Sequence, residues 1–265
     1  TVTIRSEDGV TETNTRNVVG ADGAFSRVAK SAGWPQQPTV PLVQAVVDLP
    51  RGIAPETSYV WFRPEDTPYF YWLIPETPTR GALGIIGDDT RNPRRLLDGF
   101  MEDKGFTPHE YQGARIPLYT QWIPVRRKVG GGTVYLAGDA AGQVKVSTVG
   151  GLVTGFRGAT GVACAIAGGP ARRELRTLRR ELDLHLLIRK TLHHFRHEDY
   201  SSLLEVIDDT AATSIGHHDR DQAARVLWKV FTARPRLARM MFRSYRQRKS
   251  FPRYEPQPAP AMVGD

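Results

Sequence analysis

A strand followed by a turn of small residues carries the groups in this sequence best suited to chemistry. The apolar run at residues 133–137 leads into Gly138-Asp139-Ala140-Ala141-Gly142, and Gly150 and Gly151 open the next helical segment. A carboxylate such as Asp139 at a strand end can accept hydrogen bonds from a chain of sugar-like hydroxyls. Small side chains let the backbone approach a flat ligand, and free N–H groups at a helix start favour its electron-rich atoms. The pattern predicts a site for a flat ligand that bears hydroxyls; the alternative is an ordinary, tightly packed strand-turn-helix.

Two further segments are candidates for binding. Val18-Val19-Gly20-Ala21-Asp22-Gly23 runs from a short strand into a glycine turn, and Arg27 stands as a cation in the following helix. Phe70-Tyr71-Trp72-Leu73-Ile74-Pro75 is a strand-like run, in which alternation directs Phe70, Trp72 and Ile74 to one face. That face suits an apolar ligand, or it buries aromatic rings in the core.

The surrounding pattern supplies the elements that must position these groups. Residues 1–5 and 11–19 are predicted to form a hairpin, and residues 26–32 a short helix. Four strands at residues 43–47, 58–63, 69–74 and 81–87, separated by prolines, predict an antiparallel sheet, followed by a helix at 94–104. Small residues predict a closely packed helix at 150–169, and leucines at helical spacing predict a helical region from residue 171.

The turn motif makes the chain resemble a known family. Residues 138–152, with Val149, Gly150, Gly151 and Leu152 at their end, resemble the second FAD motif of geranylgeranyl reductases, which are p-hydroxybenzoate hydroxylase-like flavoproteins. The resemblance implies that Asp139 contacts the ribityl chain of FAD and that the Val149–Leu152 turn lies by the isoalloxazine ring. The family usually has three glycines in a row here, so Val149 is a departure that alters the fit near the flavin. Asp22, Gly23 and Arg27 match the family's Asp-Gly motif, and Phe70, Trp72, Ile74 and Pro75 match the pattern that lines its substrate cavity.

The resemblance implies an α/β (α+β) fold and an FAD-dependent enzyme that reduces carbon–carbon double bonds of an isoprenoid, with NADPH, NADH or ferredoxin as electron donor. It assigns residues 1–39 and 131–170 to an FAD-binding domain, 40–130 to a substrate-binding sheet and 171–265 to a C-terminal helical region. No Gly-x-Gly-x-x-Gly motif is present. We therefore expect the chain to lack an N-terminal nucleotide-binding part of about 100 residues and to bind FAD poorly alone.

Two other readings stay open. The Phe70–Pro75 segment also resembles a signature of flavin halogenases, which favours a flavin-dependent monooxygenase or halogenase. The chain could also be a non-catalytic remnant. Histidines at 193, 194 and 197 lack a supporting metal motif, so no metal is predicted.

Composition and charge limit the kinds of partner and the cell compartment that this chain is expected to have. The single cysteine excludes a disulfide framework. No apolar run reaches the roughly 18 residues that a membrane span needs. The net charge of +8 is concentrated in residues 222–254, which hold ten basic residues, no acid and interleaved apolar side chains. That segment suits an anionic membrane surface or a helix packed on the core, and no nucleic acid motif accompanies it. We expect a cytoplasmic protein that is peripheral at the membrane if the first alternative holds.

Overall fold

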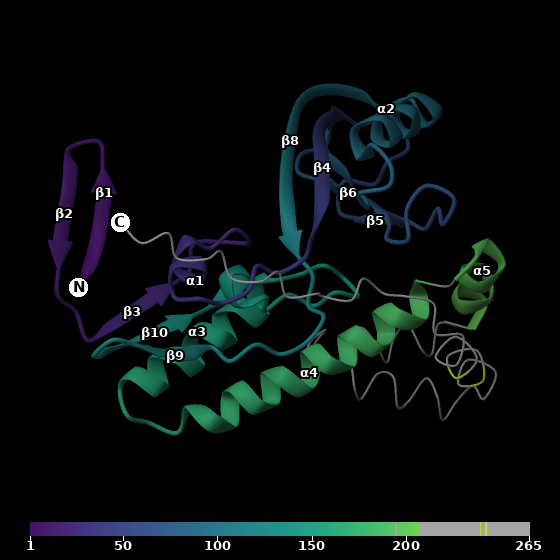
Figure 1. Cartoon of the computed structure of the whole chain (residues 1–265). Coiled ribbons are helices and arrows are strands. Elements are labelled where there is room, and N and C mark those ends of the chain that lie inside the picture. Colours follow the sequence, from purple (N-terminus) through teal and green to yellow (C-terminus); the bar gives the residue numbers. More distant parts are fainter. Residues whose placement is uncertain (194, 207–238, 240–241, 243–265) are drawn as a thin grey trace. The chain divides into compact units, whose positions relative to one another are not determined.

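A computed structural model describes residues 1–193, 195–206, 239 and 242. The described part is a mixed α/β fold, as the sequence predicts, and it divides into two compact units (Figure 1). The first unit comprises Thr1–Pro38 and Pro117–Asp183, and the second comprises Thr39–Ile116 and the described residues from Leu184 onward. Each unit has its own hydrophobic core.

The first unit begins with the predicted hairpin, formed by β1 (Val2–Ser6) and β2 (Gly9–Thr13) in antiparallel register. The prediction of one strand over residues 11–19 is wrong, because β2 ends at Thr13 and β3 (Asn17–Gly20) belongs to another sheet. The Thr15 hydroxyl donates to the Asn17 carbonyl and accepts from the Asn17 amide. This local turn redirects the chain between the two strands.

The sheet that holds the turn motif has the order β3-β10-β9. Its central strand, β10 (Gly132–Leu136), runs parallel to β3 and antiparallel to β9 (Arg126–Val129). Leu136 stands opposite Gly20, so the carboxyl ends of β3 and β10 lie at the same edge. Helix α1 (Arg27–Ser31) follows β3, whereas the 3-10 turn η1 (Gly138–Ala141) and helix α3 (Leu152–Ile166) follow β10. Ligands of open α/β sheets bind beyond such carboxyl ends.

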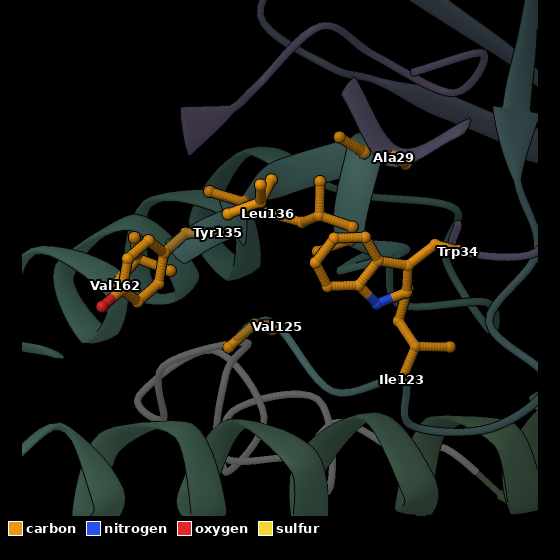
Figure 2. Close-up of a cluster of buried hydrophobic side chains, with 11 residues drawn as sticks. Ala29, Trp34, Ile123, Val125, Tyr135, Leu136 and Val162 are labelled. Atoms are coloured by element: carbon orange, nitrogen blue, oxygen red, sulfur yellow. The ribbon is translucent and has the colours of Figure 1, made fainter. Parts of the chain in front are cut away.

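The core of the first unit fixes this sheet (Figure 2). Leu136 is fully buried among Trp34, Val125 and the other residues of the cluster. The Trp34 indole N–H donates to the Pro124 carbonyl over 2.8 Å. Burying aromatic and branched side chains of this size contributes about 1.5–3 kcal/mol each, so the end of β10 is held in a firmly packed position.

The second unit is built on a five-stranded sheet with the order β5-β6-β7-β4-β8. Its strands are β4 (Thr39–Asp48), β5 (Tyr59–Trp61), β6 (Tyr71–Pro75), β7 (Arg80–Ile86) and β8 (Thr107–Pro117). The pairings β5-β6, β6-β7 and β7-β4 are antiparallel, which confirms the predicted sheet. The strands β8 and β9 were not predicted.

Helix α2 (Pro93–Lys104) covers one face of this sheet. The Asn92 side chain accepts from the Arg94 and Arg95 amides at the helix start, and Gly105 ends the helix with a left-handed φ of 71°. Leu97, Phe100 and Met101 are buried against strand residues that include Tyr71 and Leu73. The predicted apolar face of this helix is therefore confirmed.

The predicted C-terminal helices are present as α4 (Ala171–Leu192) and α5 (His197–Val206). Leu178, Leu182 and Leu186 of the leucine series are buried. None of the helices in the described part is long and apolar enough to span a bilayer. The basic segment 222–254 lies outside the described residues, apart from Arg239 and Phe242.

Candidate functional site

The turn after β10 is locked by a buried glutamine. The Oε1 atom of Gln143, a fully buried residue, accepts from the Gly138 amide over 2.8 Å, while the Thr154 hydroxyl donates to the Gln143 carbonyl. Gly142 closes the 3-10 turn with a φ of 64°, a left-handed value that favours glycine. The strand, the turn and α3 are thus joined by hydrogen bonds through one residue.

Asp139 lies at the second position of this turn and faces the start of α3. A Cβ atom added to Gly151 would lie 3.1 Å from Asp139 Oδ1, so the absence of a side chain there makes room for the carboxylate. Among the described residues, no hydrogen bond or ion pair reaches this carboxylate. Half-burial raises the pKa of the Asp139 carboxyl. A partly desolvated carboxylate with free acceptor capacity is suited to receive hydrogen bonds from hydroxyl groups of a ligand.

The start of α3 adds hydrogen-bond donors beside this acceptor. Gly151 is the N-cap residue and provides no side-chain cap, and Leu152 is 74% exposed. The first N–H groups of a helix have no partner within the helix, and the dipole of a 15-residue helix favours negative charge there. The turn therefore offers an acceptor and a set of donors side by side, which fits the ribityl chain and the electron-rich ring edge of a flavin.

Val149, at the predicted departure from the family motif, has a left-handed backbone. Its φ is 53°, and no other residue except glycine has a positive φ in the described part of the chain. A β-branched side chain in this region is strained. The strained residue lies in a short loop that the Lys145 amide closes by donating to the Gly150 carbonyl over 3.0 Å. The loop therefore holds Val149 in a conformation that glycine would adopt freely.

We expect Val149→Gly to stabilise the protein. Removing the strain contributes about 1–2 kcal/mol, and the greater freedom of glycine in the unfolded chain offsets about 0.4–1 kcal/mol of that gain. Urea denaturation measures the free energy of unfolding. The matched control is Val149→Ala, which keeps a Cβ atom and should show no such gain. A glycine variant less stable than the wild type would contradict the inference that the Val149 backbone is strained.

The Asp-Gly segment reaches the same sheet edge, but its carboxylate is already engaged. Asp22 accepts from the Ser26 hydroxyl over 2.5 Å and from the Val28 amide over 3.1 Å, at the start of α1. Burial alone would raise the pKa of Asp22, but these hydrogen bonds outweigh it and lower the pKa. Asp22 thus caps α1. Arg27 is exposed, and a Cβ atom on Gly23 would meet nothing within 4 Å.

The predicted alternation in β6 is confirmed by the second unit. Tyr71 and Leu73 are fully buried towards α2, whereas Ile74 on the other face is 48% exposed. Phe70 and Trp72 share that face as an edge-to-face pair, 6.4 Å apart between ring centroids. Tyr71 and Leu73 are therefore the residues of this segment that pack into the core. Phe70, Trp72 and Ile74 lie on the opposite face, which we call the open face of the sheet. Pro75, half-buried, ends the strand.

Trp72 lies flat on this face because Gly84 stands opposite it in β7. A Cβ atom on Gly84 would lie 2.1 Å from the Trp72 ring. We therefore expect Gly84→Ala to push the indole off the sheet and lower stability by about 1–3 kcal/mol. Tryptophan fluorescence should change in the variant, and the same change should be absent when Gly84→Ala is made in a Trp72→Phe background. An unchanged spectrum in both backgrounds would contradict this packing.

Two residues that the sequence analysis did not single out extend the open face. Val60, opposite Trp72 in β5, is 51% exposed, and Phe62 packs edge-to-face on Phe70 at 6.2 Å. The aromatic run Tyr59–Phe62 was a signal for this extension, because alternation with β6 places Val60 beside Trp72. Within the described residues, no group of three or more His, Cys, Asp or Glu side chains could hold a metal ion.

Comparisons with known proteins agree with the motifs. No family model matches the chain. It is 28% identical over 239 residues to digeranylgeranylglycerophospholipid reductase 2 of Methanothermobacter thermautotrophicus, covering 81% of this chain and 60% of the relative. It is 34% identical over 169 residues to digeranylgeranylglycerophospholipid reductase 1 of Methanopyrus kandleri, covering 58% of this chain and 43% of the relative. The chain thus spans 60% or less of the length of these two curated relatives.

Solved structures share the fold. A geranylgeranyl bacteriochlorophyll reductase-like protein from Thermoplasma acidophilum aligns with a TM-score of 0.68 at 14% identity, over 91% of this chain and 65% of that protein. The flavin-dependent brominase Bmp2 aligns with a TM-score of 0.59 at 15% identity, over 90% of this chain and 65% of that protein. The chain therefore shares the fold of these two proteins, and its similarity in sequence to the two digeranylgeranylglycerophospholipid reductases supports the predicted resemblance to geranylgeranyl reductases.

Proposed function

We propose that this chain provides the flavin-contacting turn and the substrate-binding sheet of an FAD-dependent oxidoreductase that reduces carbon–carbon double bonds in the isoprenoid chains of a lipid. The observation that carries the proposal is the Asp139 carboxylate, free of partners among the described residues and set against the glycine that starts α3. The names of the two curated relatives supply the reaction and the substrate class.

The residues of the turn would hold the flavin and orient it. Asp139 would accept hydrogen bonds from ribityl hydroxyls, and the first amides of α3 would donate to the ring, with their dipole stabilising negative charge on it. A bound reduced flavin would supply the hydride to the substrate double bond. The rest of the predicted cofactor set (Gly138, Ala140, Ala141 and Gly142) provides the backbone of the turn, and Asp22 contributes by fixing α1 at the same sheet edge.

The open face would hold the isoprenoid chain. Phe70, Trp72 and Ile74 offer aromatic and aliphatic surface of the kind that binds apolar ligands, and their contact with the substrate would exclude water from it. NADPH, NADH or ferredoxin would reduce the flavin. Contact of residues 222–254 with an anionic membrane surface stays a prediction.

The test is turnover of a geranylgeranyl lipid without oxygen, with FAD and a chemical reductant supplied. We expect mass spectrometry to detect products heavier by two hydrogens for each double bond reduced. A strict requirement for oxygen would instead indicate a monooxygenase or halogenase. Absence of turnover under both conditions, at saturating FAD, would favour a non-catalytic role for the chain.

A further inference from the structure

Arg189 of α4 is a buried cation that pairs with no carboxylate in the described part of the chain. The residue is 1% exposed, and no carboxylate pairs with it among the residues that the structure describes. Arg157 of α3 provides the contrast, since it forms ion pairs with both Glu174 and Glu181. An arginine stays charged in proteins, and a buried charge is costly unless it is paired. An anionic ligand close to Arg189 would therefore stabilise this unpaired positive charge.

The contacts of Arg189 satisfy only part of its guanidinium. Its Nη2 group donates to the Pro68 carbonyl, its side chain donates to Tyr200, and its Cζ atom lies 4.6 Å from the centre of the Tyr69 ring. All three partners are neutral groups, and the buried Nε atom has no acceptor among the described residues. The positive charge is thus surrounded mainly by aromatic rings, where it is poorly screened.

A continuous series of aromatic rings leads from Arg189 to the open face. Tyr200 stacks on Phe62 at 4.4 Å, Phe62 packs edge-to-face on Phe70 at 6.2 Å, and Phe70 packs edge-to-face on Trp72 at 6.4 Å. Beyond these rings, the exposed side chains of Val60 and Ile74 continue the apolar surface. One end of this aromatic series therefore lies against the buried charge of Arg189, and the rest of it continues into an exposed apolar surface.

Arg63, in the same unit, does not share this property. It lines a groove of about 580 Å³ near the start of α2, where it forms ion pairs with Glu65 and Asp66. The charge of Arg63 is thus already compensated, whereas that of Arg189 is not.

We propose that the end of the open face next to Arg189 binds the anionic phosphate of an isoprenoid lipid, and that its chain then lies along Phe62, Phe70 and Trp72. This inference rests on the proposed function, and it adds that the substrate is recognised by its charged head as well as by its chain. Because Arg189 is covered, it acts as a positioning residue whose charge attracts the phosphate to the adjoining surface. The phosphate in turn supplies the counter-charge that the described residues do not provide.

The experiment compares two ligands that differ only in the head. Geranylgeranyl monophosphate and geranylgeraniol are each titrated by calorimetry into the wild-type chain and into Arg189→Gln. We expect the wild type to bind the phosphate at least tenfold more tightly than the alcohol. Arg189→Gln should lose that preference while its affinity for the alcohol stays within about twofold, since the lost interaction is worth about 1.4 kcal/mol for each tenfold.

Two further variants separate charge from structure. Arg189→Lys keeps the charge and should keep at least a fivefold preference for the phosphate. Lys190→Gln removes an exposed cation from the neighbouring position of the same helix and should leave the preference unchanged. Near-ultraviolet circular dichroism and melting temperature show that each variant is folded. If Arg189→Gln does not fold, the comparison of Arg189→Lys with the wild type decides.

Four results would overturn the inference. Equal wild-type affinity for the two ligands would remove the phosphate site but leave isoprenoid binding intact. If Arg189→Gln lost affinity for both ligands equally, Arg189 would have a merely structural role. The same would hold if Arg189→Lys lost the preference for the phosphate over the alcohol. Failure of the wild type to bind either ligand would remove the proposed isoprenoid function itself, and this inference with it.

Discussion

Replacing Asp139 with alanine is expected to weaken flavin binding by tenfold to a hundredfold. The carboxylate would accept charge-assisted hydrogen bonds from the ribityl hydroxyls, and such bonds contribute about 1.5–3 kcal/mol. Titration of FMN, followed by quenching of flavin fluorescence, measures the dissociation constant. The matched control is Asp8→Ala, which removes an exposed carboxylate from the β1–β2 turn of the same unit and should have no effect.

A second readout distinguishes a binding role for Asp139 from a structural one. Because burial raises the pKa of this carboxyl, the folded state binds its proton more tightly than the unfolded state does. Ionised Asp139 therefore costs stability at neutral pH, and that cost disappears as the pH falls through the raised pKa. Asp139→Asn should be as stable as the wild type or more stable at neutral pH, while it binds flavin less tightly. A large loss of stability together with unchanged flavin binding would contradict the assignment.

Gly158→Ala should cause the largest loss of stability among single-methyl additions at this site. A Cβ atom there would lie 1.7 Å from Gln143 Oε1, and Gln143 is fully buried. Overpacking costs about 1–3 kcal/mol, and moving Gln143 would also leave the half-buried Gly138 amide without its acceptor, at about 1–3 kcal/mol more. Urea denaturation should therefore show a fall of about 2–6 kcal/mol in the free energy of unfolding.

Two controls test whether Gln143 causes that loss. Gly99→Ala, in helix α2, adds a methyl group where nothing lies within 4 Å, so it should raise stability by up to about 1 kcal/mol. The double variant Gly158→Ala with Gln143→Ala removes the overlapping amide. It should be more stable than the sum of the two single effects by more than about 1 kcal/mol. Additive effects would mean that Gly158 and Gln143 do not share this contact.

Much of the fold is predictable from the sequence because its elements bury one face. The alternating strands β6 and β7, the apolar strand β10 and the α2 helix all carry a periodic apolar pattern. The strands β8 and β9 were missed for the opposite reason. Both lie at sheet edges, all four residues of β9 are exposed, and most of β8 is exposed. An edge strand has a neighbouring strand on one side only and is held there by backbone hydrogen bonds. Its side chains can therefore stay exposed, and its sequence needs no apolar pattern.

The candidate site was predictable only in part. Asp139 and the α3 start follow one another in sequence, so a motif can identify them. The capping role of Asp22 depends on competition between a ligand and the Ser26 and Val28 groups, and residue types do not decide that competition. Arg189 was missed because its burial depends on Pro68 and Tyr69, about 120 residues earlier in the chain. Contacts over such sequence distances leave no local signal.

The proposed function requires that the turn after β10 contact a flavin through Asp139 and the first amides of α3. Nuclear magnetic resonance of the isotope-labelled chain during titration with FMN tests it most directly, since amide signals report even weak binding. We expect progressive shifts of the Asp139, Gly151 and Leu152 amide signals that are lost in Asp139→Ala, with no shift in the β1–β2 hairpin. Unchanged signals at those three amides at saturating FMN, or shifts that persist in the alanine variant, would contradict it.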